Sequence, residues 1–289
     1  MEMTSVFAQQ IWNGLVSGSA YALFAVGLTL IFGILRIIHM AHGESYMLGA
    51  MVFWTLIEVY KLNFVFSLLL SAVAVGVVGI VINYIGVKPL IKEGLLPSML
   101  STLAISYLIV YSTIAFSDVD TRVVSTIFEG KFSVFGAILT KQQIVLLSIG
   151  LATMTAVSFF LAKTTIGKAM RATAQDQTGA YLVGLDVQWI FGFTMVLSSV
   201  LAAIGGVIVG SIWTAYPSMG WDMILKGYAV VIVSGMGSLP ACIATAFLLG
   251  TTEALFSQYV SMQLTNGYTY GVLLIVCLLR PQGLFARTK

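Results

Sequence analysis

Charge is scarce in this sequence. Asp, Glu, Lys and Arg together make up 9% of the 289 residues, whereas about a quarter of the residues of a soluble domain are charged. So few charges cannot cover a surface that faces water, which excludes a soluble globular protein. Hydrophobic residues make up 59% of the chain, and the mean hydropathy is +1.00. We therefore expect the lipid bilayer to surround most of the chain.

Cysteine and histidine are nearly absent. The two cysteines, Cys242 and Cys277, lie inside apolar runs, where unpaired thiols behave as small hydrophobic side chains. The two histidines, His39 and His42, are followed closely by Glu44. A zinc site needs three or four ligands with defined geometry, so no metal site is expected, and hydrogen bonding between helices is the simpler interpretation.

Signatures of catalysis and nucleotide binding are also missing. The Gly-Lys pairs at 130–131 and 167–168 are not followed by Ser or Thr, as a P-loop requires. No nucleophile elbow or pair of carboxylates suggests an enzyme. The net charge of +3 is too small to indicate a nucleic-acid partner.

Apolar runs dominate what is present. A spanning helix needs roughly 20 apolar residues, and the sequence predicts one membrane domain over residues 1–289, an all-α bundle of about eight or nine spanning helices with broken helices. The run at 224–233 is short and could either span or re-enter the membrane. The runs are 10–35, 45–57, 64–87, 97–116, 142–162, 189–213, 224–233, 241–255 and 268–279.

Basic residues predict the orientation, because they favour the cytoplasmic side. If residues 163–188 are cytoplasmic, nine of the 14 basic residues lie on that side and five on the other. The N-terminus is then outside and the C-terminus inside. The cytoplasmic group comprises Arg36, Lys88, Lys92, Lys163, Lys168, Arg171, Arg280, Arg287 and Lys289. The outer group comprises Lys61, Arg122, Lys131, Lys141 and Lys226.

Two stretches interrupt the apolar pattern. Residues 234–240 read Ser-Gly-Met-Gly-Ser-Leu-Pro and break a helix. They form either an ordinary cytoplasmic turn or a break at membrane depth, where half-helix ends border a pathway. Residues 36–44 have the same two interpretations. Glu253, a lone acid beside an apolar run, is expected to form a structural pair or to lie at the interface rather than relay protons.

Glycine pairs and one polar segment complete the pattern. Gly14 with Gly18, and Gly206 with Gly210, are spaced to let helices pack closely, or alternatively to slide during gating. Residues 163–188 are too polar to span, and helix-forming residues at 169–182 predict a short amphipathic helix. That helix would lie in the lipid interface or dock on a cytosolic partner.

A series of short motifs runs along nearly the whole chain. The motifs are residues 13–23, 27–34, 38–44 with 47–50, 167–172 with 180–185, 235–240, and 280–285. Together they resemble a known family, the LivH-like permeases of branched-chain amino acid ABC importers. One departure is Ser234, where the family usually has glycine.

The resemblance implies partners and sites. In such importers two permease subunits, copies or paralogues, dock on two cytosolic ATP-binding subunits that hold ATP and Mg²⁺, and an extracytoplasmic solute-binding protein delivers the solute. The permease itself needs no cofactor and lies in the cell inner membrane. The implied ATPase-coupling residues are Gly167, Arg171, Ala172, Asp176 and Gly184. The residues implied to border the pathway or helix breaks are His42, Gly43, Glu44, Gly235, Gly237 and Ser238.

Three other functions are compatible with the composition. An ion-coupled secondary transporter would need charges inside the membrane for its coupling ion. A membrane enzyme would use His42 and Glu44. A purely structural subunit would tolerate changes in residues 163–188.

Overall fold

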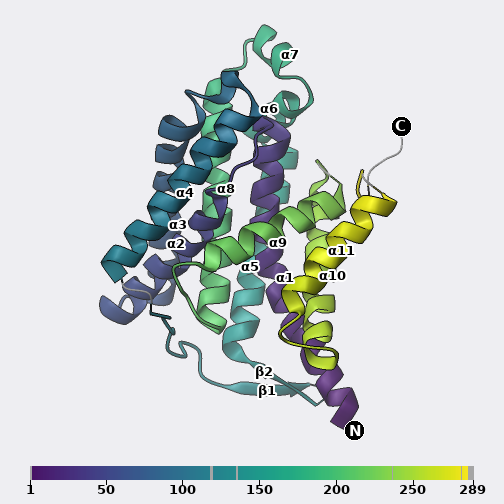
Figure 1. The fold of residues 1–289 in the computed structure, drawn as a ribbon. Helices are drawn as coiled ribbons and strands as arrows, with labels where there is room; N and C mark the ends of the chain where they lie inside the picture. The colour runs from purple at the N-terminus through teal and green to yellow at the C-terminus, as the bar shows by residue number, and fades with distance from the viewer. Residues whose placement is uncertain (1, 118–119, 135, 236, 281, 286–289) are drawn as a thin grey trace.

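The structure is a computed structural model that describes residues 2–117, 120–134, 136–235, 237–280 and 282–285 (Figure 1). Met236 and Pro281, which belong to two of the motifs, lie outside the described residues. So do Arg287 and Lys289, two of the basic residues assigned to the cytoplasmic side.

Helices make up almost all of the fold. In chain order they are α1 Glu2–Leu35, α2 His42–Trp54, α3 Phe64–Ile82, α4 Leu95–Ser117, α5 Lys141–Lys163, α6 Thr165–Gln175, α7 Gln177–Leu182, α8 Val187–Ile212, α9 Met219–Ser234, α10 Leu239–Tyr259 and α11 Thr265–Leu279. Short π-helical turns extend α2 over Thr55–Val59 and α3 over Asn83–Val87, and a 3₁₀ turn covers Ile91–Glu93.

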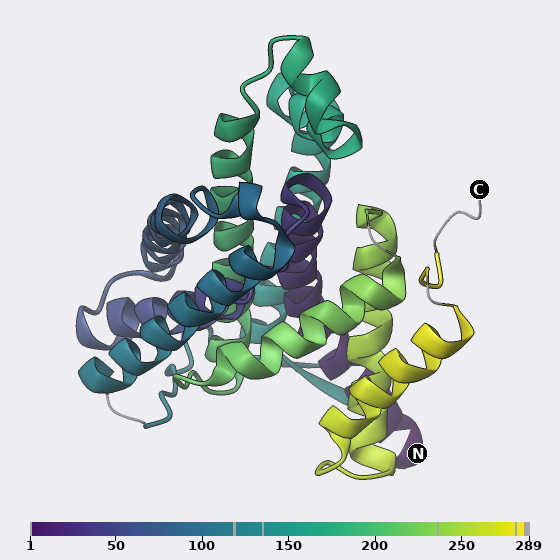
Figure 2. The ribbon, with the colours of Figure 1, turned by 45° about the horizontal axis from the view of Figure 1, so that its top comes forward.

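The bundle is that of a multi-span membrane protein. Within the described residues, α1, α3, α4, α5, α8 and α10 are long and apolar enough to cross a bilayer. The shorter α2, α9 and α11 also lie in the bundle, so the predicted count of about eight or nine spanning helices is roughly consistent with the described part of the chain, although three of the nine are too short to be counted as spans. The start of α1 and the end of α11 lie toward opposite ends of the bundle, and α6 and α7 project from the end where α1 finishes (Figures 1 and 2).

Glycine allows the central helices to touch along their backbones. A Cβ at Gly14 or Gly18 of α1 would collide with α10 at Thr251 or Phe247. On α8, a Cβ at Gly206 would collide with the backbone of Tyr46 in α2. The predicted close packing at these glycine pairs is confirmed. In a bilayer no hydrophobic effect drives helices together, so their association depends on close packing of this kind.

Small polar residues form the buried stripe of α4. Ser98, Thr102 and Ser106 are spaced four apart and fully buried, whereas Leu108 and Tyr111 face outward and are exposed. The hydroxyls of Ser98 and Thr102 donate hydrogen bonds to backbone carbonyls, so burying them in the bundle interior costs little free energy. This stripe turns α4 toward the start of α2.

A β-hairpin closes the end of the bundle opposite α6 and was not predicted from the sequence. Strands β1 Lys131–Val134 and β2 Ala137–Thr140 pair antiparallel. The side chain of Gln9 fastens the hairpin to α1 through both the N–H and the carbonyl of Ile138. The preceding loop is held at α2, where the indole of Trp54 donates to Val123 O at 3.0 Å.

The segment over residues 163–188 forms two helices, not the single amphipathic helix expected. Asp176 has an extended backbone (φ −147°) and ends α6. Its carboxylate accepts a hydrogen bond from Thr178 N at 2.9 Å and so caps α7. Met170 of α6 is buried and Tyr181 of α7 is exposed, because the break at Asp176 prevents the two residues from sharing one helix face.

Candidate functional site

The first interrupted helix lies between α1 and α2. Arg36 leaves α1 in the left-handed conformation (φ +58°), and residues 37–41 contain no helix. The ring of His42, which starts α2, then packs against Gly27. Gly27 lies eight residues before the end of α1, or roughly 12 Å at 1.5 Å per residue. The chain therefore re-enters the bundle, and α2 begins well inside it.

The second interrupted helix lies between α8 and α9. Residues 213–218 leave the end of α8 and return into the bundle, where α9 begins at Met219. A Cβ on Gly43 would overlap Gly220 O, and a Cβ on Gly220 would lie 2.6 Å from Gly43 O. The N-termini of α2 and α9 thus meet backbone to backbone, a junction that we call the Gly43–Gly220 crossing. Of the two suspected breaks, 36–44 reaches membrane depth.

The other suspected break is a turn at the α6 end of the bundle. Gly235 (φ +83°) and Gly237 (φ +102°) turn the chain from α9 into α10. Together with Ser238 they line a groove shared with Arg36 and Arg171. Because that groove opens beside α6, residues 234–240 lie far from the Gly43–Gly220 crossing.

Buried polar groups surround the crossing. The hydroxyl of Ser106 donates to Glu44 Oε1 at 2.8 Å, and Met40 N donates to Thr102 Oγ1 at 3.1 Å. A ring nitrogen of His42 lies 3.2 Å from Phe24 O. The contact of Thr102 gives the non-helical backbone at Met40 a partner inside the bundle, as membrane depth demands. Glu44 lies in the first turn of α2, where a carboxylate is favoured by the helix dipole.

The histidines do not assemble a metal site within the part of the chain that is described. The rings of His39 and His42 lie 6.0 Å apart. No group of three or more His, Cys, Asp or Glu among the described residues could hold a metal ion. The two cysteines are free.

Removing the Ser106 hydroxyl should destabilise the protein. Ser106→Ala leaves the buried Glu44 carboxylate without its hydrogen-bond donor, and losing a partner of a buried group costs about 1–3 kcal/mol. We expect a lower melting temperature of the purified protein. Ser148→Ala removes a hydroxyl that only bonds its own helix on an exposed face and should leave the melting temperature unchanged.

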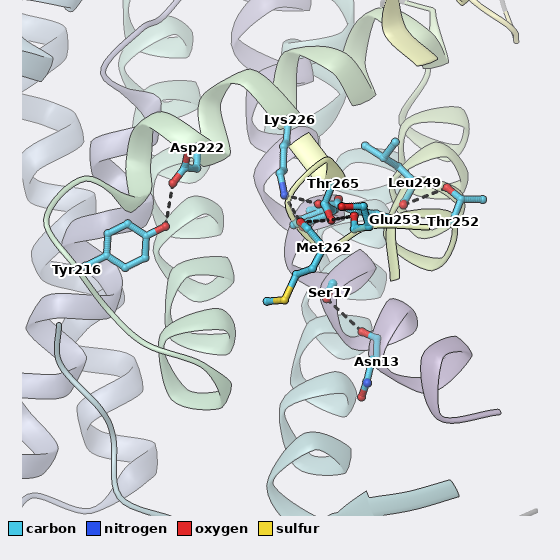
Figure 3. A network of polar contacts seen from close by, with 12 residues as sticks. Asn13, Ser17, Tyr216, Asp222, Lys226, Leu249, Thr252, Glu253, Met262 and Thr265 are labelled. Carbon is cyan, nitrogen blue, oxygen red and sulfur yellow. Dashed lines mark hydrogen bonds and ion pairs between the residues drawn. The ribbon is translucent and has the colours of Figure 1, made fainter. Parts of the chain in front are cut away.

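A charged cavity lies beside the crossing, between α1, α8 and α9. It has a volume of about 170 Å³, and its lining includes Tyr21, Tyr46, Asp222 and Lys226. Lys226, one of the outer group of basic residues, has a buried side chain. It is 13% exposed and forms an ion pair with Glu253 of α10 (Figure 3). The predicted structural pair for Glu253 is confirmed.

The coupling residues implied by the resemblance lie on α6, α7 and the turn after them. Gly167 is buried against the last turn of α5. Arg171 and Ala172 are exposed on α6. Asp176 separates the two helices, and Gly184 (φ +86°) forms the turn after α7. The structure thus gathers these five residues at one end of the bundle.

Hydrogen bonds tie this segment to the end of α1. A guanidinium nitrogen of Arg36 lies 3.4 Å from Ala174 O and 3.3 Å from Gln175 O, where a cation suits the carbonyl end of a helix. The amide of Gln177 donates to Ile34 O at 2.8 Å. The adjoining groove has a volume of about 930 Å³. Movement of α6 would therefore act on the segment that leads to the crossing.

Sequence reasoning missed Tyr21, Asp222 and Gly220. The one available signal was the spacing of Asp222 and Lys226, four residues apart beside a short apolar run. Opposite charges at that spacing share a helix face, which could have indicated that the run at 224–233 is not surrounded by lipid.

Comparison with known proteins gives the family. The family model described as branched-chain amino acid transport system / permease component matches residues 10–279. The high-affinity branched-chain amino acid transport system permease protein LivH of Escherichia coli K12 is 30% identical over 298 residues, covering 98% of this chain and 96% of that protein. The corresponding permease protein BraD of Pseudomonas aeruginosa is 28% identical, covering 98% and 97%.

A solved structure has the same fold. PsaBC from Streptococcus pneumoniae in complex with Fab aligns with a TM-score of 0.51 at 16% identity, covering 93% of this chain and 91% of that chain. The resemblance found in the sequence motifs is confirmed. The chain belongs to the family of branched-chain amino acid transport system permease components.

Proposed function

We propose that this chain is the membrane-spanning permease subunit of an ABC importer in the cell inner membrane. It moves branched-chain amino acids or related small solutes, while partner subunits bind and hydrolyse ATP with Mg²⁺. The observation that carries the proposal is the pair of half-helices that meet at Gly43 and Gly220 inside the bundle. Half-helix ends at membrane depth are the parts from which solute pathways are built.

The contacts of α6 support a route for coupling. Closure of the ATP-binding subunits moves α6, and Arg36 and Gln177 carry that movement to the end of α1. The re-entrant segment at 36–41 follows directly and ends at α2. The crossing therefore opens or closes when α6 shifts. Arg171, Ala172, Asp176, Gly167 and Gly184 form or hold the docking segment.

The distribution of basic residues supports an orientation with the N-terminus outside and the C-terminus cytoplasmic. Basic residues favour the cytoplasmic side. Those at or near the α6 end of the bundle are Arg36, Lys88, Lys92, Lys163, Lys168, Arg171 and Arg280. Those toward the opposite end are Lys61, Arg122, Lys131 and Lys141. The extracytoplasmic binding protein then docks at the end that carries the β-hairpin.

Co-purification tests the assembly. The tagged chain is purified from its native membrane in mild detergent, and its companions are identified. Two cytosolic ATP-binding subunits and a second permease, a copy or a paralogue, are expected. A chain that purifies alone and has no ATP-dependent uptake would contradict the proposal.

Arg171→Ala should reduce transport without removing the protein from the membrane. The side chain is exposed on α6, and its contact within the chain is a long one, 3.5 Å to Ala162 O. A surface charge of this kind contributes about 0–1 kcal/mol to folding, so the fold should persist. Uptake by the complete transporter is expected to fall severalfold at normal protein levels. Lys61→Gln, at the opposite end and in an exposed ion pair, should transport normally, and unchanged uptake by Arg171→Ala would argue against its coupling role.

One observation favours a second candidate, an ion-coupled transporter. The pair of Lys226 and Glu253 provides charge inside the bundle, and such charges mark ion pathways. Uptake by the reconstituted chain alone, driven by a proton or sodium gradient without ATP, would establish this candidate. Uptake that requires the ATP-binding subunits and survives collapse of the gradient would eliminate it.

A further inference from the structure

The charged cavity between α1, α8 and α9 contains two opposite charges that do not pair with each other. Asp222 and Lys226 lie four residues apart on α9, a spacing at which opposite charges usually form an ion pair. Here Tyr216 Oη donates to Asp222 Oδ2 at 2.8 Å. Lys226 instead reaches Glu253 of α10 and the hydroxyl of Tyr21, 3.3 Å away. Figure 3 shows the two side chains held by different parts of the fold.

Each of these charges keeps hydrogen-bonding capacity. The ammonium of Lys226 has three N–H donors, of which Glu253 and Tyr21 accept two. Asp222 is exposed at the side of the cavity and bonds through Oδ2 alone, which leaves Oδ1. Both residues line the cavity, so the donor left on Lys226 and the oxygen left on Asp222 are available to a ligand of complementary charge.

Most of the remaining wall of the cavity is apolar. Met219 and Met223 of α9 are buried there, and Val209 and the ring of Tyr46 lie opposite. Methionine side chains adapt to aliphatic groups of different shape. The volume of about 170 Å³ suits one small solute. The cavity therefore combines a cation, an anion and an aliphatic surface within one small space.

We propose that this cavity is the membrane binding site for the zwitterionic head of an amino acid. Lys226 and the Tyr21 hydroxyl hold the α-carboxylate, Asp222 holds the α-ammonium, and the methionines receive the aliphatic side chain. Tyr216 and Glu253 are positioning residues that keep the two charges apart. The inference rests on the proposed function, since it names the part of the importer's solute that the pathway recognises.

Protection of a cysteine tests binding directly. Ser17 lines the cavity, and its hydroxyl bonds only to Asn13 O in its own helix, so Ser17→Cys should fold. The variant is prepared in the complete transporter. Cys277, which is partly exposed, is replaced by serine so that the reagent does not modify it, whereas Cys242 is buried and can stay. Leucine should slow modification of this cysteine by a methanethiosulfonate reagent. Isovalerate lacks the ammonium and is one carbon shorter than leucine, and isoamylamine lacks the carboxylate, so each should protect at least roughly tenfold less well.

Neutral variants identify the two charged groups. Asp222→Asn should weaken protection by leucine roughly tenfold but spare the weak protection by isovalerate. Lys226→Gln alone would leave the buried Glu253 carboxylate without its ion-pair partner and would destabilise the fold. The double variant Lys226→Gln with Glu253→Gln removes both charges together and should assemble with its partners. It should nevertheless lose protection by leucine while sparing that by isoamylamine.

The outcomes separate this inference from the proposed function. Leucine uptake by the wild-type transporter, with protection that depends on both charges, supports both. Wild-type uptake with no protection, or with equal protection in the neutral variants, overturns the site and leaves the importer intact. If the assembled transporter takes up no amino acid and isovalerate or an uncharged amide protects as well as leucine, both the substrate class and the site are wrong.

Discussion

Gly43→Val is expected to abolish transport. A Cβ at Gly43 would overlap the carbonyl oxygen of Gly220 and lie 2.9 Å from its carbonyl carbon. These are backbone atoms that cannot rotate away, so α2 and α9 must separate at the crossing. Overpacking in a close-packed core costs about 1–3 kcal/mol of stability. A collision with backbone atoms should cost at least the upper value of that range. Uptake by the complete transporter, measured at equal protein levels, should fall to background.

Two comparisons make this prediction specific. Gly220→Val meets the same contact from the other helix, through Gly43 O at 2.6 Å, and should fail in the same way. Gly271→Val adds the same bulk within α11, where a Cβ meets nothing within 4 Å, and should transport normally. Normal uptake by Gly43→Val would mean that the half-helix ends are not closely packed during transport. Where valine prevents assembly, the smaller Gly43→Ala still tests the point and should give partial uptake.

The fold was largely predictable because the bilayer limits the choices. Scarce charge and long apolar runs allow only helices across the membrane, and the ends of the runs followed from Pro, Gly and charged residues. The β-hairpin escaped prediction because each strand has only four residues and every residue of the first strand is exposed, so the sequence pattern is too short to distinguish a hairpin from a loop. Its stability comes instead from distant contacts such as that between Gln9 and Ile138.

The depth of a helix break was harder to predict. Turn-forming residues at 234–240 and at 36–44 indicate breaks equally well, but local sequence does not say where in the bilayer a break falls. Contacts decide it, and the backbone contact of Gly43 with Gly220 joins residues far apart in the chain. Local sequence does not give the depth of the break at 213–218 for the same reason.

The burial of Lys226 could not be predicted from its sequence neighbours. The distribution of basic residues predicts the side of the membrane on which Lys226 lies, but not whether its side chain is exposed. Its partner Glu253 lies 27 residues away on another helix, and nothing local to Lys226 reveals that pair. The charged cavity was therefore beyond sequence reasoning, although the spacing of Asp222 and Lys226 was visible.

Gly167→Val is expected to uncouple the permease from its ATP-binding subunits. Thr164 caps α6 by accepting from Gly167 N at 3.0 Å, so α6 folds back sharply onto the end of α5. A Cβ at Gly167 would overlap Phe160 O and lie 2.6 Å from the Cα of Leu161. Valine must therefore tilt α6 away from α5 and weaken the contacts that join it to α1.

The expected result is an inserted permease that does not hold its partners. Overpacking of about 1–3 kcal/mol at this junction lowers the population of the docked arrangement roughly tenfold or more. Co-purification of the ATP-binding subunits and ATP-driven uptake should fall together, while the amount of permease in the membrane stays normal. Gly271→Val again serves as the control. Because Gly167 lies far from the charged cavity, protection of Ser17→Cys by leucine should persist in Gly167→Val, and its loss would mean that valine distorts the whole bundle rather than the docking of α6.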